Sequence, residues 1–128
     1  MLLLYLGAGA CTPQAGPPAV PATASRGARL YEGNCSACHQ PGGQGMPNVY
    51  PSLAGSPLVL GDPGVLARWV VQGTRPDSMP AGRYAAMMPK FAWLRAEDAA
   101  ALLTYLRASF GNSASAVDAA TVAAALGS

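Results

Sequence analysis

The chain has 128 residues and a formal charge of +2, and 51% of its residues are hydrophobic. This length suits one compact domain and is too short for two. Eight basic and six acidic residues without a long Lys/Arg run argue against a nucleic-acid-binding protein. The 15 Gly and 12 Pro favour long loops, so the small core needs additional buried apolar surface from a bound group.

Residues 1–11 form a mostly apolar leader that ends at Cys11. Such a segment is too short to span a bilayer, and small residues before a cysteine resemble a secretory or bacterial lipoprotein processing site. We therefore expect export, with two possible fates for Cys11: attachment of lipid, or loss with a discarded leader. Residues 12–24 are rich in Pro, Ala and Thr and predict an extended tether.

The compact domain is expected at 25–112, and its first main helix at about 25–35. Ser25 can cap this helix, and its apolar side contains Ala28, Leu30 and Tyr31. Residues 40–61 then contain nine Gly or Pro residues and predict a long irregular loop. A loop of that length in a small domain usually serves a function.

The second main helix is expected to begin at Asp62-Pro63, because Asp suits the N-cap and Pro the first helical position. Gly73 is its natural stop, and its apolar side contains Val65, Leu66, Trp69 and Val70. A second long loop, 74–94, follows and contains three of the five methionines.

The third main helix opens with Glu97 and Asp98, whose charges suit the positive end of a helix dipole. It is expected to run to about Ser109 and to end before Gly111, and its buried face contains Leu102, Leu103, Tyr105 and Leu106. The tail, 113–128, has room for one short Ala-rich helix. No segment alternates like a strand, so the predicted fold class is all-α.

The basic residues are unevenly distributed. One stretch contains a single acid, Asp77, among five bases: Arg68, Arg75, Arg83, Lys90 and Arg95. Two interpretations stay open, namely an ordinary solvated face and a docking patch for an acidic partner.

Cys35-Ser36-Ala37-Cys38-His39 is the C-x-x-C-H signature of c-type haem attachment. Two thiols three positions apart on a helical turn can reach the two vinyl groups of one porphyrin, and the adjacent imidazole then lies at the iron. A zinc site needs four ligands, and His39 is the only histidine. A thioredoxin-like pair would need a βαβ unit, which the sequence does not suggest. We therefore predict one covalently attached haem c.

The iron also needs a sixth ligand or an open site. Met88 is preferred, because Pro89 stiffens the backbone after it and Phe91 and Trp93 can wall a pocket. The alternatives are Met79, Met87 and Met46, the last of which is too close to His39 to cross easily to the other ring face. The second ring nitrogen of His39 needs an acceptor, for which the carbonyl of Pro51 is the candidate.

On these residues the stretch 25–112 resembles class I cytochrome c. In that family a Gly and an aromatic of the first helix meet the last helix; Gly27 and Tyr31 hold those positions, opposite Leu102 and Tyr105. Pro51-Ser52-Leu53 and Met88-Pro89-Lys90-Phe91 are similar to two further family segments. The resemblance implies three main helices and long loops around one haem, with His39 and Met88 on the iron and Pro51 accepting from His39.

The stretches 50–57 and 102–112 are also similar to haem domains in the cytochrome subunits of bacterial membrane-bound alcohol and aldehyde dehydrogenases, although those subunits carry several haems. Arg95 stands where the family usually has a Ser or Thr helix cap.

The resemblance implies a periplasmic electron carrier, not itself an enzyme. It would receive electrons from a dehydrogenase and pass them to an oxidase or another cytochrome. The alternative function is a haem sensor or small peroxidase with an open or labile sixth site, and a weaker one is a structural lipoprotein.

Overall fold

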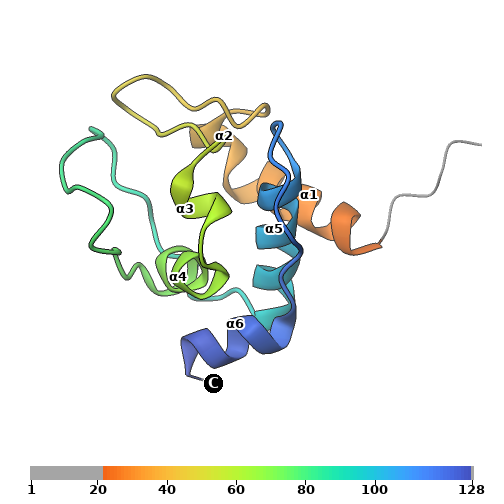
Figure 1. The fold of residues 1–128 in the computed structure, drawn as a ribbon. Coiled ribbons are helices and arrows are strands. Elements are labelled where there is room, and N and C mark those ends of the chain that lie inside the picture. Colours follow the sequence, from red (N-terminus) through yellow and green to blue (C-terminus); the bar gives the residue numbers. More distant parts are fainter. Residues whose placement is uncertain (1–21, 128) are drawn as a thin grey trace, which may run out of the picture.

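The computed structural model describes residues 22–127, in which helices and long loops make up the fold (Figure 1). The leader, Cys11 and most of the expected tether lie outside the described residues. The elements are α1 (Ala22–Asn34), α2 (Ser36–His39), α3 (Pro57–Leu60), α4 (Pro63–Ala67), the π-helical segment η1 (Arg68–Gln72), α5 (Ala96–Ala108) and α6 (Ala119–Leu126). Between residues 22 and 127 there is no strand, only an isolated bridge between Met46 and Tyr50. The predicted all-α class is confirmed.

Helix α1 begins earlier than the sequence predicted. Its first residue is Ala22, so residues 22–24 of the expected tether are helical and Ser25 lies inside the helix instead of capping it. No Gly or Pro interrupts the chain between Pro21 and Gly27, and alanine favours the helical state. The expected start at Ser25 was therefore wrong by one turn.

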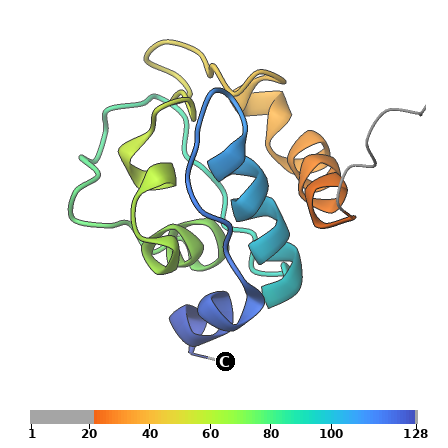
Figure 2. The same cartoon turned by 45° about the vertical axis from the view of Figure 1, so that its right-hand side comes forward.

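Helices α1 and α5 pack closely at Gly27. A Cβ atom at this position would lie 2.3 Å from the carbonyl oxygen of Ala101 and 2.7 Å from the Cβ of Tyr105, so only glycine allows this approach. One turn later the rings of Tyr31 and Tyr105 lie 5.5 Å apart, and Phe110 joins the same cluster. In Figures 1 and 2, α5 stands between α1 on one side and α3 and α4 on the other.

The Asp62-Pro63 start and the Gly73 stop are confirmed. The Asp62 carboxylate accepts the N–H of Val65 at 2.8 Å, and Gly73 adopts a left-handed φ of 73°. The buried face differs from the expected one, because Val65 and Trp69 are only half-buried while Ala67 and Val71 are buried. The π-helical geometry of η1 widens the turn after Ala67, which bears on the positions of Trp69 and Val71 only.

Two shorter helices complete the core. Helix α3 lies inside the stretch expected to be loop, where the Ser56 hydroxyl accepts the N–H of Val59 and Pro57 opens the helix. Helix α6 in the tail is confirmed; Asp118 caps it, and Val122 is fully buried where α6 packs on α4 and α5. Through Val117 and Val122, the described part of the C-terminal segment thus contributes to the core.

The third main helix is confirmed as α5. Arg95 occupies its N-cap and makes no capping hydrogen bond, as the departure from the family pattern implied. The helix ends at Ala108, before Gly111, and both Phe110 and Gly111 have left-handed backbone conformations. Within residues 22–127, no helix has both the length and the apolar character that a bilayer crossing requires.

Candidate functional site

The cysteine motif occupies the junction of α1 and α2. The N–H of Cys35 donates to the carbonyl of Tyr31, and the N–H of His39 donates to the carbonyl of Cys35, each at 2.8 Å. This helical winding puts Cys35, Cys38 and His39 on one turn. Cys35 is buried, Cys38 is half-buried, and both are free thiols.

The His39 ring is held by a backbone carbonyl. Its Nδ1 lies 2.9 Å from the carbonyl oxygen of Pro51, the contact that was expected. Burial lowers the pKa of His39, partly opposed by this hydrogen bond, so the ring is neutral near pH 7. A neutral imidazole that donates from Nδ1 presents the lone pair of Nε2, which is the form that binds iron.

The loop that brings Pro51 to His39 is built on glycines. The N–H of Gly45 donates to the carbonyl of His39 at 2.9 Å, and Gly45 has a left-handed φ of 64°. A Cβ atom at position 45 would lie 2.4 Å from the carbonyl oxygen of Tyr50. The N–H of Leu53 donates to the carbonyl of Gly43 at 2.7 Å and closes the loop. The Gly-rich composition therefore serves a specific return of the chain onto His39.

The environment of Cys35 disfavours negative charge. Burial, followed by the neighbouring Cys38, raises the pKa of Cys35 to about 11, so it is a thiol at neutral pH. A hydrogen bond with the side chain of Cys38 raises the pKa of Tyr50. A thioether carries no charge, so this buried setting suits a Cys35 sulfur that ends as a thioether.

The methionines differ in burial. Met88 is half-buried against the hydrophobic core, whereas Met87 next to it is 91% exposed. Met79 is half-buried, and Met46 is 45% exposed on the loop that follows His39. Cys35, Cys38, His39 and Pro51 are thus gathered in one place, while Met88 comes from the separate loop between η1 and α5.

Two buried polar residues at the C-terminal end of α5 and just after it were not singled out from the sequence. The Arg107 guanidinium, 5% exposed, donates at 2.8 Å to the carbonyls of Val59, Gly61 and Ser115. The buried Asn112 side chain ties α5 to the loop after Pro51. Their partners lie up to 59 residues away, and no local pattern signals such contacts.

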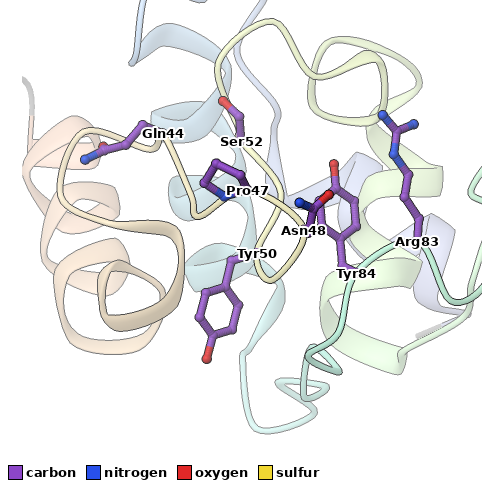
Figure 3. A pocket seen from close by; sticks show the side chains of 7 residues that line it. All are labelled: Gln44, Pro47, Asn48, Tyr50, Ser52, Arg83 and Tyr84. Atoms are coloured by element: carbon purple, nitrogen blue, oxygen red, sulfur yellow. The ribbon is translucent and has the colours of Figure 1, made fainter.

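A cavity of about 270 Å³ lies where the two long loops meet. The N–H groups of Ala85 and Ala86 donate to the carbonyls of Asn48 and Val49 and join these loops. Figure 3 shows the side chains that line the cavity: Gln44, Pro47, Asn48, Tyr50, Ser52, Arg83 and Tyr84. The lining mixes polar and aromatic side chains and contains one cation and no acid.

The chain is similar to several known proteins. Over 90 residues, 69% of the chain, it is 34% identical to the cytochrome c subunit of a quinone alcohol dehydrogenase from Gluconobacter oxydans. Over 91 residues, 67% of the chain, it is 32% identical to cytochrome c-552 from Thermus thermophilus and covers 69% of that protein. Over 93 residues, 70% of the chain, it is 32% identical to the cytochrome c subunit of a gluconate 2-dehydrogenase from Pantoea cypripedii.

The shared region amounts to one domain. The chain covers 19% of the alcohol dehydrogenase subunit and 21% of the gluconate dehydrogenase subunit. The family model for cytochrome c matches residues 24–109, which include the cysteine motif, Pro51 and Met88. The chain therefore belongs to the cytochrome c family, whose members carry a covalently bound c-type haem and transfer electrons without being enzymes themselves.

Proposed function

We propose that Cys35 and Cys38 attach a single haem, that His39 and Met88 ligate its iron, and that the chain carries electrons from a dehydrogenase toward a respiratory oxidase. The observation that carries this proposal is the His39–Pro51 hydrogen bond beside two free thiols on the same turn. When bound, the haem supplies an iron that alternates between the ferric and ferrous states. The residues around it hold that iron and set its preference between the two states.

The donor set fits a haem. Two thiols three positions apart supply the attachment points, and a buried neutral imidazole with its Nδ1 engaged supplies one axial ligand. Cys35 and Cys38 keep the group attached in a domain rich in loops, and the Pro51 carbonyl keeps the His39 ring from rotating.

Burial supports Met88 as the sixth ligand. A ligating thioether has to be turned inward, and Met88 packs against the core while Met87 is almost fully exposed. A thioether is a soft ligand that favours the ferrous state and fills the position where oxygen or peroxide would otherwise bind. Met79 is half-buried and remains the alternative ligand.

Basic residues along the second loop are proposed to meet acidic groups, either on a partner protein or on the haem carboxylates. Arg83 lines the cavity between the two loops, and its guanidinium lies 5.7 Å from the ring centre of Tyr84 (Figure 3). Arginine suits carboxylates because it donates two parallel hydrogen bonds. Arg68, Arg75 and Lys90 belong to the same proposed surface, at which Arg75 stacks on Trp69.

A dehydrogenase is proposed as the electron donor because two relatives are cytochrome c subunits of dehydrogenases. The acceptor would be an oxidase or another cytochrome. Following the export signal expected at residues 1–11, we place the protein in the bacterial periplasm, with lipid on Cys11 as a proposed membrane attachment.

The test compares the exported haem protein with Met88→Ala and Met87→Ala. Met88→Ala should change the ferric absorption spectrum and let carbon monoxide bind the ferrous protein rapidly at pH 7, whereas Met87→Ala should leave both as in the parent. An unchanged spectrum in Met88→Ala would refute the ligand assignment. Rapid carbon monoxide binding by the parent would favour a sensor or peroxidase with an open sixth site. Protein that matures without haem would end the proposal altogether.

A further inference from the structure

Asn112 joins the end of α5 to the loop that follows Pro51. Its Nδ2 donates to the carbonyls of Leu53 at 3.0 Å and Leu106 at 2.9 Å, and its Oδ1 accepts the N–H of Gly55 at 2.8 Å. The residue is 9% exposed. All three bonds run to backbone groups, and two of them span 57 and 59 residues of sequence.

The segment that Asn112 holds is the same one that presents the Pro51 carbonyl. Leu53 lies two residues after Pro51, and its two backbone polar groups are anchored on opposite sides. Its N–H donates to Gly43 on the loop, and its carbonyl accepts from Asn112 on the C-terminal side. The turn that begins two residues after Pro51 is therefore held by Asn112 as well as by the loop itself.

We propose that Asn112 is a positioning residue for the His39 imidazole, acting through the Leu53–Gly55 turn and the Pro51 carbonyl. This inference rests on the proposed role of His39 as an iron ligand. It assigns to Asn112 more than a cap for α5, because only one of its three bonds satisfies a carbonyl of that helix.

The expected consequence is a change in the ligand strength of His39. A well-placed acceptor at Nδ1 draws the proton away from the ring and makes Nε2 a stronger donor to iron, which favours the ferric state. Without Asn112 the turn gains freedom and the Nδ1–H···O bond weakens. The reduction potential should then rise, and the Nδ1 proton of His39 should exchange faster with water.

The control is a second pair of side-chain hydrogen bonds, made by Thr104 of α5. The Thr104 hydroxyl accepts the N–H of Val117 at 2.9 Å and donates to its carbonyl at 3.1 Å, away from the Pro51 loop. Thr104→Val removes these two bonds with little change of shape. It should lower stability without altering the His39 environment.

The experiment uses the exported haem protein and the variants Asn112→Ala, Asn112→Asp and Thr104→Val. Asp keeps an oxygen that can accept the N–H of Gly55. Its second oxygen replaces the Nδ2 donor and cannot hydrogen-bond the carbonyls of Leu53 and Leu106, so Asp should behave like Ala. The readouts are the reduction potential and the exchange rate of the His39 Nδ1 proton, followed by NMR of the ferrous protein. Both Asn112 variants should raise the reduction potential. They should also speed the exchange of the Nδ1 proton by about tenfold, which is the ratio expected for loss of roughly one net hydrogen bond.

Two results would overturn the inference. One is that Asn112→Ala loses stability as Thr104→Val does while the potential and the Nδ1 proton stay at parental values. The other is that Thr104→Val moves both readouts as far as Asn112→Ala does. If Asn112→Ala does not accumulate, Asn112→Ser serves in its place. The serine hydroxyl is too short to reach the backbone groups of both Leu53 and Gly55. Failure of the proposed function is seen separately, as a parent protein whose ferrous spectrum shows no iron-bound His39.

Discussion

The contact between α1 and α5 depends on the missing side chain of Gly27, and Gly27→Ala tests this dependence. The new Cβ atom would lie 2.3 Å from the carbonyl oxygen of Ala101 and 2.7 Å from the Cβ of Tyr105. A normal contact is roughly 3.5 Å, so α1 has to move by about 1 Å. The backbone oxygen of Ala101 cannot swing aside as a flexible side chain would. The movement also loosens the contact between the rings of Tyr31 and Tyr105.

The size of the effect follows from two opposing contributions. Overpacking costs about 1–3 kcal/mol, and a backbone clash belongs at the upper end of that range. Alanine returns up to about 1 kcal/mol because it is the better helix former. We therefore expect the free energy of unfolding of Gly27→Ala to fall by about 2 kcal/mol.

Gly33 is the matched control, because it lies in the same helix and a Cβ atom there would meet nothing within 4 Å. Gly33→Ala should raise the free energy of unfolding by about 0.5–1 kcal/mol. The assay is urea unfolding of the haem-loaded protein at pH 7, followed by far-ultraviolet circular dichroism. If both alanines shift the unfolding midpoint in the same direction, the argument from helix contact at Gly27 is refuted.

Two further predictions concern polar groups outside the haem site. Arg107→Lys should lower the free energy of unfolding by about 2 kcal/mol, because one ammonium cannot replace the contacts of a guanidinium with Val59, Gly61 and Ser115. Arg107→Ala should lower it by about 4 kcal/mol. Equal stability of the Lys variant and the parent in urea unfolding would contradict this. The hydrogen bond from the N–H of Thr121 lowers the pKa of Asp118 in the folded protein. The capping carboxylate of Asp118 therefore stabilises the fold at pH values above the pKa that Asp118 has in the unfolded chain. This stabilisation is lost as the pH falls through the lower pKa of the folded state. Asp118→Ala should therefore be less stable than the parent at pH 7, with a difference that shrinks below about pH 4 in thermal unfolding.

Features that depend on sequence neighbours were predictable. The Asp62-Pro63 start, the Gly73 stop and the helix from Glu97 all rest on groups within one or two turns of each other, and the structure has them. The haem motif is predictable for the same reason, because its thiols and imidazole lie within five consecutive residues. Helix α3 was missed because four residues are too few to show helical periodicity.

The contact of His39 with Pro51 is an intermediate case. The sequence indicated that some carbonyl of the Gly/Pro loop would accept from the ring and offered Pro51 as the candidate, which the family resemblance also implied. The structure places that oxygen 2.9 Å from Nδ1, but it does so through the left-handed turn at Gly45 and the Asn112 bonds. Such contacts depend on the tertiary arrangement, so no sequence window contains them.

Side chains of α5 and of the residues just after it form hydrogen bonds with backbone groups of the loops. A small domain with long loops has many backbone groups outside helices, and each buried one needs a partner. Arg107, Asn112 and Thr104 supply partners to the end of α3, the turn after Pro51 and the tail before α6. Helix α5 and its C-terminal extension, which contribute no predicted iron ligand, therefore hold the loop that presents the Pro51 carbonyl to His39. Substitutions on its polar side should reach the haem only where their bonds end on that loop, and among these three residues only Asn112 meets that condition.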